Sequence, residues 1–311
     1  MRELKGLKII VTGGAGFIGS NLAEHLSKDN EVTIIDKIHT GNEANIKEAV
    51  KNGAILIKDD ARNIGNYDLN PDVVFHLGMY SSTPMYGANR HFVGEVIDGA
   101  VSMYEFCVKK GAKIVIASSS SIYNGQKPPH REDMIPIVTD FYTEARIGVE
   151  RLAELYAKLN KLNAVAVRFF SVYGKHEEYK GQYANLVTQF MWAAQKGEDP
   201  VIYGDGSQTR DFTYVDDTVR ALELAAMKDF DKFEIFNAGR GHAYTINEMI
   251  TILGKQMGKE IKPKYIINPL KNYVEHTQAD TKKATEMLGF TAQYSLDQGI
   301  AKLLEYYKNK K

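Results

Sequence analysis

Short apolar runs alternate with longer helix-like segments through the first half of the chain. Six of these runs are typical of strands: residues 7–12, 31–35, 55–60, 72–78, 113–117 and 164–169. Residues 96–110 and 142–160 are helix-like, and the second segment places Ile147, Leu152 and Leu159 on one face. Because strands and helices alternate with short connections, the pattern predicts an α/β fold. We expect a doubly wound parallel sheet with helices on both faces.

The pattern changes after residue 170. The later elements are a helix that ends near Trp192, a strand at 200–203, a helix near 215–227, a strand at 233–237, and two or three helices with a strand at 264–267. The strand at 233–237 is expected to rejoin the sheet.

This change in rhythm predicts two structural units. The larger is expected to contain residues 1–172 with a return segment at about 213–240. The smaller, C-terminal α/β lobe is expected to contain residues 173–212 and 241–311 and to bind the substrate. A cleft between the two is the default ligand site.

A glycine turn follows the first apolar run. Gly13, Gly16 and Gly19 recur every third position between a predicted strand and a predicted helix. Glycine permits the tight turn and the close approach of the backbone to a pyrophosphate, and the free N–H groups of the helix would face that group. The turn therefore predicts a Rossmann-type dinucleotide site.

The second strand ends in Asp36, about twenty residues after the glycines. An acidic side chain there accepts from the ribose hydroxyls of adenosine and repels a ribose phosphate, which favours NAD over NADP. Lys37 follows directly and weakens that preference slightly.

Composition narrows the function classes. Basic and acidic residues balance at 39 each, so we expect no general attraction to nucleic acid or to an anionic membrane. No apolar run approaches the roughly eighteen residues of a membrane span. The single Cys107 cannot form an internal disulfide, which fits a cytoplasmic protein. No cluster of His, Cys, Asp and Glu has metal-ligand spacing, so we predict no metal site.

Hydroxyl groups gather after the fifth strand, where residues 118–121 are all serine. Ligands of parallel sheets bind outside the carboxyl ends of the strands, so Ser119 is expected to face the site. Tyr142 and Arg146 lie four residues apart on a predicted helix, which places the phenol beside a cation that favours the phenolate form. Ser119, Tyr142 and Arg146 are therefore the candidate catalytic residues for oxidising an alcohol. Without a dinucleotide site, an ordinary amphipathic helix would explain the Tyr and the Arg.

Nearly the whole chain resembles the extended short-chain dehydrogenases/reductases, in their nucleotide-sugar epimerase/dehydratase branch. The motifs that carry the resemblance are residues 12–19, 60–62, 75–77, 118–123, 168–174 and 204–212. The resemblance implies that NAD is held by Gly13, Gly16, Phe17, Ile18, Asp36, Asn42, Asp60, Ala61 and Arg146. It also implies Ser119 and Tyr142 as the catalytic pair, a homodimer formed through the helices at 96–110 and 142–160, and Arg210 as a contact to the diphosphate of a nucleotide sugar.

The sequence departs from the family pattern at four places. Arg146 replaces the family lysine, and its planar fork differs in shape from a compact ammonium. Ser171 replaces the usual asparagine. A late phosphate-binding arginine is missing, and Lys271 is the candidate replacement. Ser120 and Ser121 stand where 4,6-dehydratases of the family carry Asp and Glu, which disfavours dehydration.

The loop at 174–183 is similar to that of bacterial ADP-heptose 6-epimerases, in which a lysine acts as a second acid/base. Lys180 matches that lysine, and the alternative is a solvated loop lysine. We assign Ser119, Ser171, Lys180, Arg210 and Lys271 to the substrate side of the site.

These observations favour NAD-dependent epimerisation of a nucleotide sugar through a transient keto intermediate, with C4 of a UDP-glucose or UDP-galactose type substrate as the target. Two alternatives stay open. One is an ADP-heptose-type 6-epimerase or another sugar-nucleotide oxidoreductase. The other is a non-catalytic NAD-binding regulator.

Overall fold

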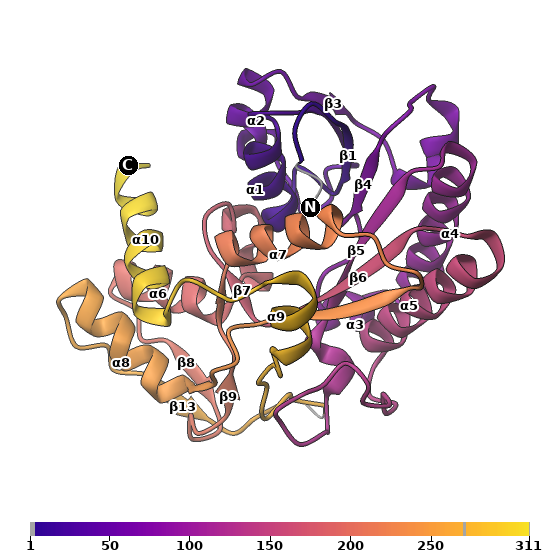
Figure 1. The fold of residues 1–311 in the computed structure, drawn as a ribbon. Coiled ribbons are helices and arrows are strands. Elements are labelled where there is room, and N and C mark those ends of the chain that lie inside the picture. The colour runs from indigo at the N-terminus through magenta and orange to yellow at the C-terminus, as the bar shows by residue number, and fades with distance from the viewer. Residues whose placement is uncertain (1–3, 270–271, 311) are drawn as a thin grey trace.

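The computed structural model describes residues 4–269 and 272–310 (Figure 1). Its centre is a seven-stranded parallel sheet in the order β11-β6-β5-β4-β1-β2-β3. The strands are β1 (Lys8–Thr12), β2 (Glu31–Ile35), β3 (Ile55–Ile57), β4 (Val73–His76), β5 (Lys113–Ser119), β6 (Ala164–Phe169) and β11 (Glu234–Ala238). The strand expected to return to the sheet is β11, which pairs in parallel with β6. The predicted doubly wound α/β fold is thus confirmed.

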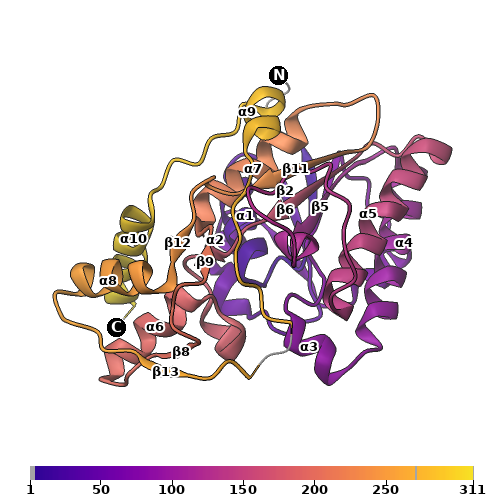
Figure 2. The same ribbon diagram turned by 90° about the horizontal axis from the view of Figure 1, so that it is seen from below.

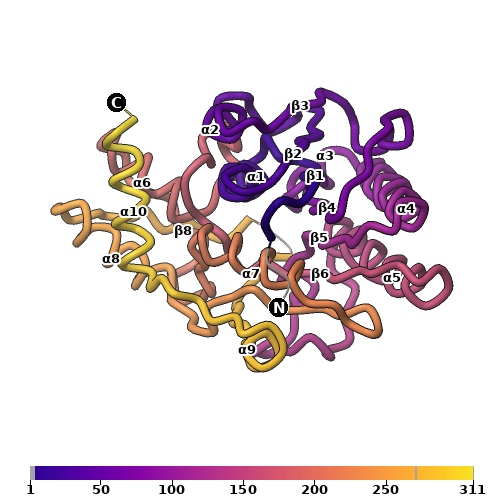
Figure 3. Tube along the Cα trace, turned by 45° about the horizontal axis from the view of Figure 1, so that its top comes forward, coloured from indigo at the N-terminus to yellow at the C-terminus, as the bar shows by residue number. Residues whose placement is uncertain are grey.

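Helices cover both faces of the sheet (Figure 2, Figure 3). One face packs against α1 (Phe17–Leu26), α7 (Val215–Met227) and α9 (Lys282–Leu288), and the other against α4 (Phe92–Lys110) and α5 (Phe141–Asn160). Side chains alternate along β1, so that Ile9 and Val11 join the first core and Ile10 joins the second. This period of two is why central strands of such sheets are apolar throughout.

A smaller group of elements surrounds a third core (Figure 1, Figure 2). Its helices are α6 (Leu186–Lys196), α8 (Ile246–Met257) and α10 (Leu296–Asn309), and its short strand pairs are β7 (Val172–Tyr173) with β10 (Thr213–Tyr214), β8 (Val201–Tyr203) with β13 (Lys264–Ile266), and β9 (Thr209–Arg210) with β12 (Tyr244–Thr245). Capping boxes begin α8 at Thr245 and α10 at Ser295. Phe17 of α1 also packs into this core, which ties it to the glycine turn.

The described α-helices also include two short ones, α2 (Lys47–Lys51) and α3 (Thr83–Ala88). The sequence pattern did not predict α3, and α4 begins at Phe92, a turn earlier than expected. Within the described ranges, no helix combines the length and apolar character that crossing a bilayer requires.

Candidate active site

A cavity of about 1240 Å³ opens at the carboxyl ends of the parallel strands. Its walls include the glycine turn after β1, the serines after β5, the start of α5, and Arg210 on β9. The cavity therefore lies where ligands bind in open α/β sheets, and it extends to the smaller group of elements around α6.

The glycine turn is shaped for a close approach of backbone and ligand. Gly13 has a φ of 68°, and a Cβ added there would lie 2.7 Å from the backbone of Gly78. A Cβ on Gly19 would collide with the carbonyl oxygen of Gly13. Only glycine fits both places, and the first residues of α1 line the same cavity, where the N-terminus of a helix suits an anion. This donor set fits the pyrophosphate of a dinucleotide.

Asp36 is held rigidly at the end of β2. Its carboxylate accepts from the backbone N–H groups of Ala15 at 2.9 Å and Ile38 at 2.7 Å. Burial raises the pKa of Asp36 and outweighs these bonds. A fixed carboxyl group on the cavity wall at this place suits the adenosine ribose.

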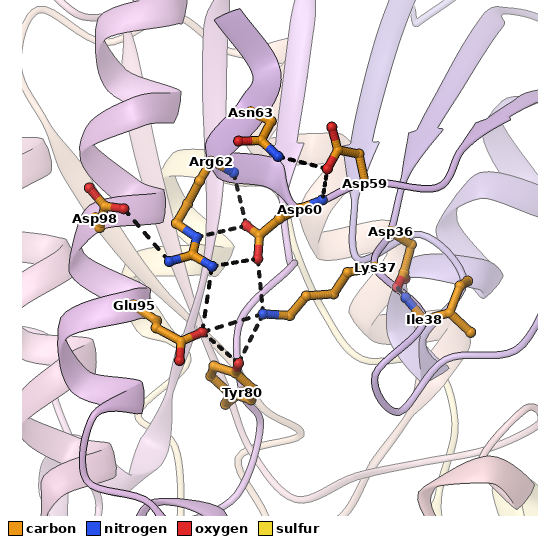
Figure 4. A network of polar contacts seen from close by, with 10 residues as sticks. All are labelled: Asp36, Lys37, Ile38, Asp59, Asp60, Arg62, Asn63, Tyr80, Glu95 and Asp98. Carbon is orange, nitrogen blue, oxygen red and sulfur yellow. Dashed lines mark hydrogen bonds and ion pairs between the residues drawn. The ribbon is translucent and has the colours of Figure 1, made fainter. Parts of the chain in front are cut away.

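Asp60 follows β3 and caps the 3₁₀ helix at Ala61–Asn66 (Figure 4). Its carboxylate accepts from Nε and Nη2 of Arg62 at 3.1 and 3.0 Å, and from Nζ of Lys37 at 3.0 Å. Burial opposes ionisation of Asp60, but these hydrogen bonds prevail and lower its pKa to about 2. Asp60 is therefore a permanent carboxylate on the cavity wall.

The predicted cofactor residues are mostly found together on that wall. Those lining the cavity are Gly13, Gly16, Phe17, Ile18, Asp36, Asp60, Ala61 and Arg146. Asn42 is placed differently, because it does not belong to the lining and its side chain accepts from the backbone N–H of Ala44 at 2.9 Å. In this structure Asn42 caps a short 3₁₀ helix at Glu43–Ile46.

Ser119 and Tyr142 both line the cavity. Ser119 ends β5, and its Oγ accepts from the backbone N–H of Ser121 at 3.1 Å. Tyr142 stands in the first turn of α5, which begins where the side chain of Asp140 caps the N–H of Thr143 at 3.1 Å. A strand end and a capped helix start thus fix the two residues.

Arg146 is buried one turn below Tyr142. Its guanidinium carbon lies 5.0 Å from the centroid of the Tyr142 ring. Nη2 donates to the carbonyl oxygen of Tyr80 at 2.6 Å, and Nη1 contacts Sδ of Met79 at 2.6 Å. The cation is thus held between the Tyr142 ring and the loop after β4.

A buried ion pair that sequence reasoning missed lies behind these residues. Glu150 on α5 accepts from Arg168 on β6 through both oxygens, at 2.9 and 2.6 Å, and from Oγ of Ser118 at 2.6 Å. Arg168 also donates to the Tyr123 hydroxyl at 2.7 Å. An arginine inside an otherwise apolar strand was the available signal, because such a charge needs a partner.

The substrate-side candidates divide into two groups. Ser171, Lys180 and Arg210 line the cavity. Arg210 donates to the carbonyl oxygens of Thr209 and Glu275 at 2.9 and 3.2 Å. Lys271 lies outside the described residues.

Lys180 is mostly enclosed, with a side chain only 16 % exposed. Its Nζ lies 3.8 Å from Oε1 of Glu177 and 5.3 Å from the centroid of the Phe17 ring. Glu177 is fully buried, and burial raises its pKa. The ammonium is thus directed toward the start of α1.

The fold and the site define a dinucleotide-binding α/β enzyme. The model of the "NAD dependent epimerase/dehydratase family" matches residues 9–239, and the chain belongs to this family. This membership confirms the Rossmann-type fold, NAD as the cofactor, and an enzymatic function in place of a non-catalytic regulator.

Three similar proteins illustrate the relationship. A "Putative UDP-glucose 4-epimerase" of Methanocaldococcus jannaschii is 32 % identical over 97 % of this chain and 98 % of its own. A UDP-N-acetylglucosamine 4-epimerase from Methanobrevibacter ruminantium, solved with UDP-N-acetylmuramic acid, has a TM-score of 0.92 at 28 % identity and covers 99 % of this chain and 100 % of its own. A UDP-glucose 4-epimerase from Thermotoga maritima, solved with UDP-glucose, has a TM-score of 0.89 at 28 % identity, with 97 % and 99 % covered.

Proposed function

We propose that the protein epimerises a UDP-hexose at C4 and interconverts UDP-glucose and UDP-galactose. The observation that carries the proposal is the arrangement of Ser119, Tyr142 and Arg146 in one cavity with the glycine turn. The similarity to the epimerases of Methanocaldococcus jannaschii and Thermotoga maritima supports the choice of UDP-glucose.

The residues have separate roles in this proposal. NAD, when bound, supplies the reversible acceptance of a hydride. Tyr142 as phenolate removes the proton of the C4 hydroxyl, and Ser119 donates a hydrogen bond to the same oxygen. Arg146 keeps positive charge at the ring face throughout. After the keto sugar turns over, Tyr142 returns the proton to the new alcohol.

The remaining lining residues limit the chemistry and hold the substrate. Ser120 and Ser121 carry hydroxyls where a dehydratase needs carboxyl groups, so water elimination has no acid/base pair at that place. Arg210 offers a planar guanidinium, which suits the oxygens of a diphosphate. Epimerisation of a nucleotide sugar is the reaction that this set of groups supports best.

The test is turnover by the purified protein supplied with NAD. UDP-glucose and UDP-galactose should interconvert, whereas Tyr142→Phe should bind NAD and show almost no turnover. A panel of UDP-, GDP- and ADP-sugars reports the nucleotide and the sugar. Complete inactivity of the NAD-loaded protein across that panel would refute the proposal.

A 6-epimerase of the ADP-heptose type is the second candidate, and the enclosed position of Lys180 favours it. In that scheme Lys180 supplies a second acid/base. Lys180→Met should then abolish turnover of an ADP-heptose while NAD binding stays intact. If the same variant interconverts the two UDP-hexoses at the normal rate, the lysine has no acid/base role.

We also propose a homodimer that packs through α4 and α5. Leu155 and Leu159 on α5 are 48 % and 67 % exposed, and an interface would cover them. Light scattering should report a dimer, and Leu155→Glu with Leu159→Glu should give a monomer. A monomeric wild-type protein would contradict this assembly.

A further inference from the structure

Lys37 follows Asp36, the residue expected to bind the ribose, and its ammonium already contacts other side chains of the cavity wall (Figure 4). Lys37 directs its side chain away from Asp36 and across the cavity wall. Its Nζ donates to Oδ2 of Asp60 at 3.0 Å and to the Tyr80 hydroxyl oxygen at 2.9 Å, and it lies 3.6 Å from Oε2 of Glu95. Two carboxylates and a phenol thus surround the ammonium.

Arg62 is the second cation in the same cluster. Its Nε and Nη2 both donate to the carboxylate of Asp60, and Nη2 also lies 3.8 Å from Oε2 of Glu95. The Tyr80 hydroxyl donates to this same Glu95 oxygen at 2.7 Å. Glu95, from the first turn of α4, is therefore shared by Lys37, Arg62 and Tyr80.

This arrangement bears on the choice between the two nicotinamide cofactors. NADP differs from NAD by a phosphate on the adenosine ribose, and proteins that take NADP supply a cation next to that position. Lys37 and Arg62 are cations of the required type, and both line the cavity with Asp36, Asp60 and Glu95. The formal charge of these five groups is −1, from three carboxylates and two cations.

We propose that Glu95 is a cofactor-specificity residue that retains Lys37 and Arg62 and so excludes NADP. A ribose phosphate would have to compete with Glu95 and Asp60 for these cations and would also meet the carboxylate of Asp36. Replacing Glu95 by its neutral isostere brings the formal charge of the five positions to zero and leaves the ammonium of Lys37 with one carboxylate, Asp60, and the Tyr80 hydroxyl as partners. The inference concerns the cofactor alone, so its failure leaves the proposed sugar chemistry untouched.

The test compares Glu95→Gln with Asp98→Asn. Both variants remove one negative charge from α4, but Asp98 does not line the cavity, is 66 % exposed, and reaches Arg62 only at 3.9 Å. The dissociation constants of NAD and NADP are measured by titration calorimetry on cofactor-stripped protein. Glu95→Gln should lower the ratio of the NADP to the NAD constant by about tenfold or more, because one of the carboxylates that compete with the phosphate for Lys37 and Arg62 is lost. Asp98→Asn should change it by less than about twofold.

Lys37→Met identifies the released cation. Added to Glu95→Gln, it should return the ratio toward the wild-type value, because the ammonium that the phosphate would contact is then missing. Alone, it should leave NADP binding unchanged, and this measurement stands even if Glu95→Gln fails to fold. Equal shifts from Glu95→Gln and Asp98→Asn, or weaker NADP binding by Lys37→Met alone, would overturn the proposal.

Discussion

The ion pair between Glu150 and Arg168 should be worth several kcal/mol when only one partner is removed. The side chains of Glu150 and Arg168 are 6 % and 3 % exposed, and two hydrogen bonds of 2.6 and 2.9 Å join them. Among the described residues, Glu150→Leu leaves the guanidinium two hydrogen-bond partners, the Tyr123 hydroxyl at 2.7 Å and the Glu132 carbonyl oxygen at 3.3 Å. An uncompensated buried charge costs about 3 to 5 kcal/mol of unfolding free energy.

The double variant separates this cost from the net value of the pair. Arg168→Met alone leaves the buried Glu150 carboxylate without its cation, so it should also lower the free energy of unfolding by about 3 to 5 kcal/mol. Glu150→Leu with Arg168→Met removes both charges and fills the space with apolar groups, so the pair of changes should cost less than either one alone. The reason is that the free energy needed to remove two ions from water offsets most of the free energy gained from their attraction.

Urea unfolding at neutral pH, followed by fluorescence or circular dichroism, measures the four free energies of this cycle. Lys302→Met is the matched control, because it breaks an exposed ion pair with Asp216 at 3.7 Å and should cost less than about 1 kcal/mol. If Glu150→Leu costs no more than this control, or if the double variant costs the sum of the single ones, the account of the buried pair is wrong.

Three further outcomes are expected. Tyr142→Phe should lower kcat by about 10²- to 10⁴-fold and leave the bound NAD per chain unchanged, as measured by cofactor release. Arg146→Met should lower kcat more than Arg146→Lys does, because only Arg146→Met removes the positive charge that lies 5.0 Å from the centroid of the Tyr142 ring. Burial lowers the pKa of His76 and of His176 to about 4, so both stay neutral in the folded protein while the unfolded chain takes up protons below about 6.5. The free energy of unfolding is therefore not reduced by these histidines above that pH, and at pH 5 it is lower by about 2 kcal/mol for each of them. His176→Asn should remove the part of this loss that His176 causes, as measured by urea unfolding at several pH values.

The sheet was predictable because its information is local. Apolar runs rich in β-branched residues, followed by glycine, acid or serine, mark strands such as β1, β2 and β5, and the return strand β11 is a shorter apolar run that contains Ile235 and Phe236. The segment before α4 carries no such pattern. Pro84 stands near the start of α3, where proline is tolerated, but the helix is only six residues long and contains Gly87, so its apolar pattern is weak and it packs against α5. Two-residue strands such as β9 and β12 are too short to leave a pattern in the sequence, and they are defined by their pairing with each other.

The candidate site was predictable where a residue follows a strand or begins a helix. Ser119 and Tyr142 belong to that class, since strand ends meet at one edge of a parallel sheet. Glu150 and Arg168 do not, because their pairing depends on how α5 crosses β6. Asn42 was assigned through resemblance alone, and in the structure it caps a 3₁₀ helix outside the cavity lining.

Lys37 shows most clearly what a sequence leaves open. Its position after Asp36 places a positive charge near the ribose, and that charge by itself suggests that the ribose phosphate of NADP could bind. Whether the charge is available depends on Tyr80 and Glu95, which come from the loop after β4 and from α4. Those contacts form only when the chain has folded. A cation beside a cofactor site therefore indicates phosphate binding only if no carboxylate of the same fold already holds it.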